Sequence, residues 1–337
     1  MSPSAAELFG HLDAMTDERG LFEHAEFDRP RPEHGYCTDD NARMLVVTSR
    51  EPDEGVPARL ARVALGFVNL AMTSDGTVRN RMTPAGTFSD APATGDWWGR
   101  AMWGLGAAAA HHDDPTVRAV AGTLFDIGGQ QRSTWPRAMA FAALGAADLL
   151  AVAPDDEIAR ALLRDAVLTI GLPADHTWCW PEPVLTYANA ALAEAVIGAG
   201  AALDDERILD DGLAMLGWLL DRWSRRGWLS VTGSEGDVGR GIAMSFDQQP
   251  IELSSLADAC WRAYTLTSDT RWADGVLAAE RWFEGDNDAR AVVHHAWNGG
   301  AYDGLRRDGV NLNQGAESTL ALVSTRQRAR SLVGAHG

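Results

Sequence analysis

The stretch ARLARVALGFVNLAM, residues 58–72, decides the fold because it differs so sharply in character from the helical stretch that follows it. Its apolar residues recur at spacings of three and four, and its charged residues share the other face, so it predicts a helix packed on one side only. The next helical stretch, AMWGLGAAAA at residues 101–110, is small or apolar on every face. A helix of that kind is a buried one. Together the two stretches predict an outer helix followed by an inner helix.

The same alternation continues along the chain. Charged amphipathic stretches at 156–170, 204–223 and 270–284 alternate with small-residue stretches at 138–151, 187–202 and 254–264. Strand-like alternation of apolar and polar residues is scarce. We expect about twelve helical segments, beginning near Ala5, Asp39, Val56, Asp96, Thr116, Thr134, Asp155, Pro183, Asp205, Asp247, Asp269 and Asn313.

Six outer and six inner helices in strict alternation describe an all-α (α/α)6 toroid, with one ring of helices inside another. A linear array of helical hairpins is the alternative. The hairpins share no repeat signature and their loops differ in length, which favours the closed ring. Because no linker rich in Pro, Gly or Ser divides the chain, we expect residues 1–337 to form a single domain.

Composition narrows the classes of function. The formal net charge is −18, which argues against nucleic acid and anionic membrane surfaces as partners. The sequence contains no long apolar run and no signal-peptide pattern, so a cytoplasmic location is expected. The three cysteines form no CxxC pair, and no HExxH, GxGxxG or phosphate-binding loop occurs. We therefore expect neither a metal ion nor a cofactor.

Polar motifs open all six inner helices. They are HGYCTDDNAR (34–43), GDWWGRAMWGLG (95–106), RSTWPRAMA (132–140), WPEPVLTYANA (180–190), SFDQQPIE (245–252) and NQGAEST (313–319). Inner helices run parallel in an alternating barrel, so these six ends are expected to meet at one rim around a central funnel. Helix capping explains one polar residue per helix and is worth roughly 1 kcal/mol. It does not explain Asp39, Asp40, Asn41 and Arg43 in one motif, although Thr38 or Asp39 could still be the cap.

Carboxylates are the candidate catalytic groups at the rim. We expect seven carboxyl groups at the rim, those of Asp39 and Glu252 and those of five catalytic candidates. Asp40 and Glu182 are the leading pair of acid and base. Asp96, Asp247 and Glu317 are alternates or sugar ligands. Crowded carboxylates repel one another, so one of them is expected to stay protonated beside an ionised partner. A protonated carboxyl group and a carboxylate are the acid and its partner that glycoside cleavage requires. An inverting enzyme would separate the two by roughly 6.5–9.5 Å. The arginines one turn into the inner helices are expected to pair with the carboxylates that stay ionised.

The remaining rim residues are candidates for binding a saccharide. Tryptophan, of which the chain has 13, offers an apolar face and one hydrogen-bond donor, which suits a sugar ring. The expected substrate-binding residues are His34, Tyr36, Asp39, Asn41, Arg43, Trp97, Trp98, Arg100, Trp135, Arg137, Trp180, Tyr187, Gln248, Gln249, Trp297, Asp303, Asn313 and Gln314.

These motifs, together with GLFEHAEFDRPRPEHGYCTDDNARML (20–45), FDQQPIELSSLADACWRAY (246–264) and AYDGLRRDGVNLNQGAESTLALV (301–323), resemble a bacterial six-hairpin glycosidase-like family. Members of that family also occur fused to group 1 glycosyltransferase domains. The resemblance covers nearly the whole chain and implies an (α/α)6 barrel, but no particular reaction. The sequence departs from the family pattern at Trp97 and Trp98, at the loop 286–300, and at Ala188, which stands in place of an acid.

Three classes of function stay open at this point. The first is a glycoside hydrolase with a carboxylate acid and a carboxylate base. The second is a glycan-binding module that serves a separate partner glycosyltransferase. The third is phosphorolysis, epimerisation or elimination on the same barrel, where phosphorolysis would use Arg43, Arg100 and Arg137. The all-helical pattern excludes a group 1 glycosyltransferase domain, which needs two doubly wound α/β halves.

Overall fold

The computed structural model describes residues 5–175, 177–237 and 245–334. Short antiparallel hairpins join β1 (Ala25–Glu26) to β2 (Arg29–Pro30) and β5 (Gly304–Arg306) to β6 (Gly309–Asn311), whereas β3 (Tyr36–Cys37) pairs antiparallel with β4 (Arg81–Met82), which is distant in the sequence. A 3-10 helix spans Pro32–His34. The described residues form twelve α-helices, α1 (Ala5–Ala14), α2 (Thr38–Thr48), α3 (Gly55–Ala71), α4 (Asp96–His111), α5 (Pro115–Gly128), α6 (Pro136–Val152), α7 (Glu157–Ile170), α8 (Ala190–Ala202), α9 (Glu206–Ser224), α10 (Pro250–Thr267), α11 (Thr270–Phe283) and α12 (Ala316–Gly334).

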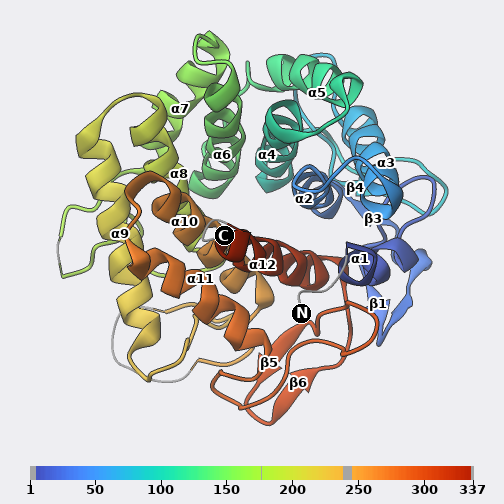
Figure 1. Ribbon diagram of the computed structural model, residues 1–337. Coiled ribbons are helices and arrows are strands. Elements are labelled where there is room, and N and C mark those ends of the chain that lie inside the picture. The colour runs from blue at the N-terminus through green and yellow to red at the C-terminus, as the bar shows by residue number, and fades with distance from the viewer. Residues whose placement is uncertain (1–4, 176, 238–244, 335–337) are drawn as a thin grey trace.

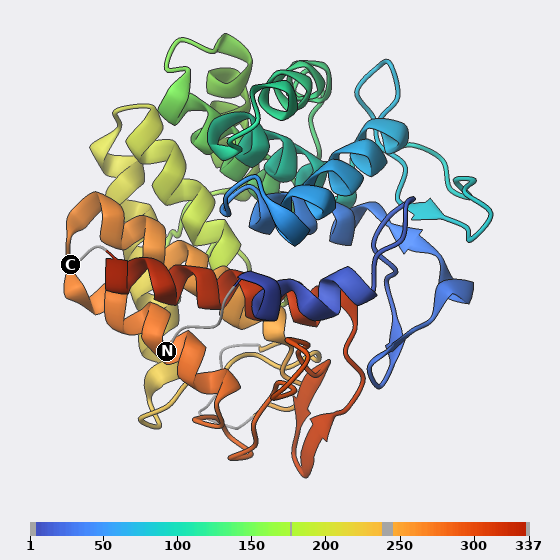
Figure 2. The ribbon, with the colours of Figure 1, turned by 45° about the vertical axis from the view of Figure 1, so that its right-hand side comes forward.

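The even-numbered helices form a closed inner ring. Each packs against the next in the order α2, α4, α6, α8, α10 and α12, and α12 packs back onto α2. Figure 1 shows these helices around the centre and the odd-numbered helices outside them. Helices α1 and α12 also contact each other, so the two ends of the chain meet where the ring closes (Figure 2). The (α/α)6 toroid expected from the sequence is confirmed.

Burial follows the predicted alternation. The inner helix α8 is buried at every position from Ala190 to Gly200, whereas the outer helix α11 buries only one face against the ring. The closest approach within the ring is between α4 and α6. A Cβ added to Gly106 would lie 2.2 Å from the carbonyl oxygen of Gly145, and one added to Gly145 would lie 2.2 Å from that of Met102. Glycine is needed at this crossing because two backbones touch there.

Three inner helices begin later than expected. Helix α8 starts at Ala190 rather than near Pro183, because Ala188 adopts a left-handed conformation with φ of 44° that a continuous helix cannot contain. Helix α10 starts at Pro250 rather than near Asp247, which has φ of 53°. Helix α12 starts at Ala316 rather than near Asn313. In all three cases the polar motif begins in the loop that leads into the helix, and Glu252 and Glu317 lie in the first turns of α10 and α12.

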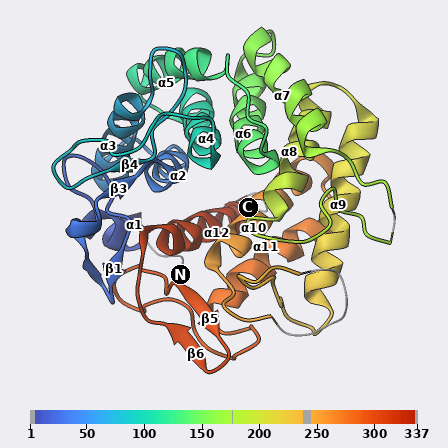
Figure 3. The same cartoon turned by 180° about the vertical axis from the view of Figure 1, so that it is seen from behind.

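The loops with β-hairpins gather at one edge of the ring. Figures 1 and 3 place the β1–β2 and β5–β6 hairpins there. The backbone N–H of Phe27 donates to the side chain of Asn313 at 3.0 Å, and the N–H of Gln314 donates to the carbonyl of Phe27 at 2.8 Å. These bonds fix the loop before α12 against the loop before α2. No helix in the described part of the chain is long and apolar enough to cross a bilayer.

Candidate active site

Aspartate side chains cap four of the outer helices, whereas the N-cap side chains of five inner helices make no capping bond. Asp114, Asp156, Asp205 and Asp269 each accept a hydrogen bond from a backbone N–H at the start of α5, α7, α9 or α11. By contrast, the residues at the N-cap positions of α2, α4, α6, α8 and α10 make no such bond. The expected cap at Thr38 or Asp39 is therefore wrong, because the N-cap position of α2 is Cys37. The acids of the inner motifs are engaged elsewhere.

A pocket of about 400 Å³ lies where several of these motifs meet, and we call it the first rim pocket. Helix α2 contributes Asp39, Asp40 and Arg43, helix α4 contributes Arg100, and helix α12 contributes Glu317. The pocket is completed by Glu23, His24, Cys37, Arg81, Gln249, Asp303, Asn311, Gly315 and Ser318. Five carboxyl groups and three guanidinium groups thus share one cavity.

Arg43 links two carboxyl groups in this pocket. Its Nη1 donates to Asp40 Oδ1 at 2.5 Å, and its Nη2 donates to Glu317 Oε2 at 2.6 Å. The thiol of Cys37 donates to the other oxygen of Asp40 at 3.1 Å. Burial raises the pKa of Asp40 to about 7, against the opposing effect of Arg43 and with the help of the nearby Glu317. The side chain of Asp40 is 4% exposed, whereas that of Glu317 is 40% exposed.

Asp39 is in a different electrostatic environment from its neighbour Asp40. Arg100 donates to Asp39 Oδ1 at 2.6 Å and lies 3.9 Å from Asp96. Burial alone would raise the pKa of Asp39, but the cations of Arg100 and Arg43 outweigh it and hold this pKa below its usual value. Two adjacent carboxyl groups in one pocket therefore prefer opposite protonation states in slightly acidic solution, where Asp40 is still protonated and Asp39 is ionised.

Hydrogen bonds continue from this pocket around the rest of the rim. The hydroxyl of Tyr187 donates to Asp96. Arg137 on α6 donates to the carbonyl of Tyr187 at 2.6 Å and to the two oxygens of Glu182 at 2.6 and 2.8 Å. It also donates to the side chain of Asn189, just before α8, at 3.3 Å. The expected pairing of the three rim arginines with carboxylates is confirmed.

The chain of contacts ends at Glu252 on α10, which is 2% exposed. The backbone and side-chain nitrogens of Asn189 both donate to Glu252 Oε2, at 3.2 and 3.0 Å. Burial raises the pKa of Glu252 to about 7. In the described part of the chain no guanidinium donates a hydrogen bond to it, unlike the carboxyl groups of Asp39, Asp40, Glu182 and Glu317.

Glu252 faces a second cavity of about 360 Å³, the second rim pocket. Gln249 lines both rim pockets, so the two are adjacent. The other residues that line the second rim pocket are Val184, Thr186, Tyr187, Thr232, Gly233, Ser234, Glu235, Gly236 and Asp237.

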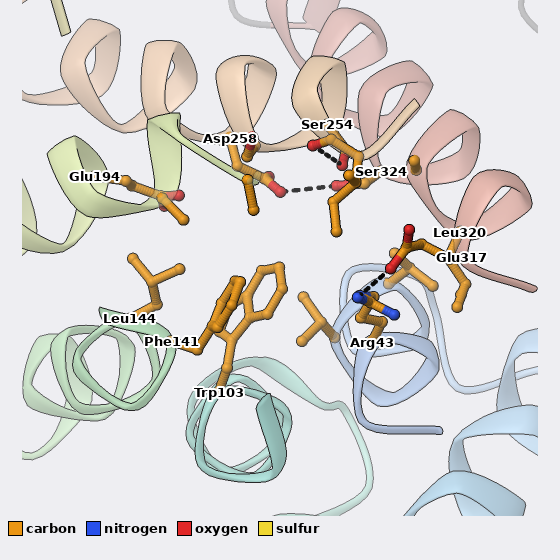
Figure 4. Close-up of a pocket in the computed structure, with 17 residues that line it drawn as sticks. Arg43, Trp103, Phe141, Leu144, Glu194, Ser254, Asp258, Glu317, Leu320 and Ser324 are labelled. Atoms are coloured by element: carbon orange, nitrogen blue, oxygen red, sulfur yellow. Dashed lines mark hydrogen bonds and ion pairs between the residues drawn. The ribbon is translucent and has the colours of Figure 1, made fainter. Parts of the chain in front are cut away.

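A narrow bore continues below the first rim pocket, with Arg43 and Glu317 at its entrance. Figure 4 shows Trp103 and Phe141 projecting into it between α4, α6 and the opposite wall. Glu194 and Asp258 lie across the bore from those aromatic rings (Figure 4). The cavity holds only about 30 Å³, about the volume of one water molecule in the liquid. The bore thus forms the floor of the rim site.

The predicted tryptophans are distributed between the core and the surface. Trp98 and Trp180 are buried, at 0% and 3% exposure, so their side chains pack in the core and do not reach a ligand. Trp97 is half-buried and donates to the carbonyl of Val78 at 2.6 Å. Trp135 and Trp297 are 66% and 92% exposed. None of the five lines the rim pockets, so the expected stacking on a sugar has no support from their positions.

Several other predicted ligands form hydrogen bonds within the protein. Asn41 accepts from the N–H of Leu21, Tyr36 donates to Asp17, and buried Gln248 donates to the carbonyl of Ser245. Gln314 accepts from Asn298 at 2.8 Å, and Asn313 is bound to Phe27 as described above. These side chains are satisfied by the protein itself.

Three further candidates differ in their access to the rim. Asp247 points outward, with its side chain 66% exposed and 3.7 Å from Arg306. His34 is exposed beside His24 and outside the rim pockets. Asp303 does line the first rim pocket, where burial raises its pKa although the N–H of Gly315 donates to it.

Several residues of the rim pockets were not among the predicted catalytic or binding residues, including Glu23, His24, Arg81 and Glu252. Glu23, His24 and Arg81 reach the first rim pocket from the loops around β1 and β4, which carry no helix-start signal. Glu252 was expected at the rim, but nothing in SFDQQPIE reveals that it would be buried without an arginine. No group of three or more His, Cys, Asp or Glu side chains that could hold a metal ion occurs among the described residues.

Known structures share this fold at low sequence identity. A sugar epimerase from a ruminal bacterium superimposes with a TM-score of 0.73 at 12% identity, covering 97% of this chain and 96% of the other. The cellobiose 2-epimerase of Spirochaeta thermophila gives 0.69 at 14%, covering 98% and 96%. A GH76 α-mannanase from Bacteroides thetaiotaomicron gives 0.67 at 13%, covering 98% and 95%. No protein-family model and no curated protein matches the sequence.

Proposed function

We propose that the protein is a carbohydrate-active enzyme that hydrolyses a glycosidic bond in the first rim pocket, with Asp40 as general acid and Glu317 as its carboxylate partner. The observation that carries the proposal is the shared guanidinium of Arg43, which binds both carboxyl groups within one cavity. One of the two is buried and the other reaches solvent. Carboxyl groups in such unequal environments suit an acid and a base acting together.

The burial of Asp40 supports its role as the acid. A pKa of about 7 keeps the carboxyl group protonated in slightly acidic to neutral solution, so it can protonate the oxygen of the leaving group. Once Asp40 has lost its proton, the cation of Arg43 at 2.5 Å stabilises the new carboxylate. Glu317, on the opposite nitrogen of the same guanidinium, takes the proton of the attacking water.

We place Glu317 rather than Glu182 opposite Asp40. Both oxygens of Glu182 accept from Nη1 of Arg137, and Glu182 lines neither rim pocket. Its proposed role is to hold Arg137 against Tyr187. Asp39, whose pKa is held low chiefly by Arg100, is the proposed acceptor for sugar hydroxyl groups in the same pocket.

The comparison structures support sugar chemistry but leave the reaction open. Two of the three are epimerases and one is a mannanase, and each covers nearly the whole chain. Epimerisation is therefore the second candidate. It too needs groups that exchange protons near neutral pH, a property that Asp40 and Glu252 share.

Incubation in D2O with NMR detection separates these reactions. The substrates are a panel of 4-nitrophenyl glycosides and unlabelled disaccharides. Hydrolysis yields new reducing ends, whereas epimerisation through carbon deprotonation introduces deuterium beside the anomeric carbon. For hydrolysis, kcat/KM should fall above about pH 7 as Asp40 loses its proton.

Variants test the assigned roles. Asp40→Asn and Glu317→Gln should each lower kcat/KM by roughly a hundredfold or more. Glu206→Gln, an exposed residue on the outer helix α9, serves as the matched control. Full activity in both rim variants would reject the assignment. Sugar binding without turnover, unaffected by Asp40→Asn, would instead indicate a glycan-binding module.

A further inference from the structure

The two rim pockets form a site larger than one sugar ring requires. Their volumes are about 400 and 360 Å³, and each lies at the lower end of the range of roughly 300–1,000 Å³ typical of small-molecule sites. The exposed side chain of Gln249 borders both. A ligand that filled only the first rim pocket would leave the second one open.

Polar contacts also connect the two cavities. Tyr187 lines the second rim pocket and donates to Asp96. Asp96 lies 3.9 Å from Arg100, which lines the first rim pocket and binds Asp39. The edge between the pockets is therefore built from side chains that can exchange hydrogen bonds with sugar hydroxyl groups, rather than from an apolar barrier.

We infer that the second rim pocket is a second sugar subsite, that the substrate is consequently a disaccharide or longer glycan, and that Glu252 recognises a hydroxyl group of the second sugar. This inference rests on the proposed function. The alternative is that Glu252 is only a structural partner of Asn189.

The surroundings of Glu252 favour recognition over structure alone. The carboxyl groups of Asp39, Asp40, Glu182 and Glu317 accept hydrogen bonds from arginine, but Glu252 accepts from Asn189 and from the backbone of Ala188, without a cation in hydrogen-bond contact among the described residues. Both bonds from Asn189 go to Oε2. A carboxyl group buried to 2% exposure at a cavity wall is costly unless its hydrogen bonds are completed. A sugar hydroxyl, which both donates and accepts, can complete them in either protonation state.

The test compares matched substrates that differ by one sugar. The probes are 4-nitrophenyl glucosides and mannosides, each supplied as the monosaccharide glycoside and as the disaccharide glycoside. For the native protein, kcat/KM should be at least about tenfold higher on the better disaccharide, as one good added hydrogen bond allows. Glu252→Gln should lower this ratio at least about tenfold, mainly through KM, while Glu206→Gln preserves it.

Two results would overturn the inference. One is equal kcat/KM of the native protein on the two substrate lengths, and the other is a disaccharide-to-monosaccharide ratio that Glu252→Gln leaves unchanged, as an equal loss on both lengths would. If no probe is turned over, the proposed reaction fails and the subsite is tested by binding. Saturation-transfer NMR with the same sugars should then show stronger binding of the disaccharide, and this preference should be lost in Glu252→Gln. An unchanged preference would reject the subsite.

Discussion

Replacing Asp40 by Asn should abolish a large pH dependence of folding stability. Burial raises the pKa of this carboxyl group from 3.8 to about 7 in the folded protein. A difference of about 3 pKa units corresponds to about 4 kcal/mol, at 1.36 kcal/mol per unit. The side chain is 4% exposed, so solvent screening does not greatly reduce this figure.

The sign follows from which state holds the proton more tightly. Below about pH 4 the carboxyl group is protonated in the folded and unfolded chains, and its ionisation costs nothing. Between about pH 4 and pH 7 the unfolded chain releases the proton first, so the folded state loses stability as the pH rises. The amide of the variant cannot ionise. The free energy of unfolding of the native protein, minus that of Asp40→Asn, should therefore fall by about 4 kcal/mol across this window.

Urea unfolding followed by tryptophan fluorescence at several pH values between about 4 and 8 measures this difference. A constant change caused by losing the Arg43 hydrogen bond cancels, because only the variation with pH is compared. Asp221→Asn, at an exposed ion pair with Arg271 on the outer ring, is the matched control and should show little variation with pH. A difference for Asp40→Asn that stays constant over the whole range would refute both the buried-acid argument and the proposed general acid.

Four further substitutions test the packing and the caps of the toroid, each by urea unfolding. Gly145→Ala should destabilise the protein by about 1–3 kcal/mol through overpacking at the α4–α6 crossing, whereas Gly122→Ala on α5, where an added Cβ meets nothing within 4 Å, should stabilise it by about 0.5–1 kcal/mol; equal effects would refute the close-approach argument. Asp258→Ala should cost about 3–5 kcal/mol, because Arg328 at 2.6 Å and a second arginine would lose a buried partner; a loss below about 1 kcal/mol would contradict this. Asp205→Ala should cost about 1 kcal/mol by removing the cap of α9, and an unchanged midpoint would show that the cap is not needed.

The ring could be predicted from the sequence because it depends on a property of whole helices. A helix buried on one face carries its charges on the other face, as in 58–72, and a helix buried on all faces carries almost none, as in 101–110. Both patterns extend over ten or more residues and can be recognised in the sequence. The start of α8 could not be predicted in the same way. One residue, Ala188, leaves the helical region at φ of 44°, and alanine gives no local signal for that conformation.

The individual site residues were harder to assign because their side chains have two plausible uses. Trp98 and Trp180 have the polar neighbours of a sugar site, yet both are buried. Tryptophan suits a core and a sugar surface equally well, so only its three-dimensional neighbours decide. Conversely, Glu252 resembles an acid placed in the first turn of a helix to favour its dipole, and burial without an arginine is invisible in the sequence.

The bonds of the rim arginines explain why acids such as Asp39 do not cap their own inner helices. Acids in the first turn of an inner helix already benefit from the helix dipole, worth roughly 0.3–1 kcal/mol. Arg43 and Arg100 then join these acids to neighbouring helices, α12 with α2 and α2 with α4. Acids that only capped their own helices could not do this. Because the rim carboxylates join neighbouring inner helices and are also the proposed catalytic groups, loss of activity alone cannot define the role of Asp40. A stability difference between the native protein and Asp40→Asn that varies with pH, together with lower activity of the variant, can define it.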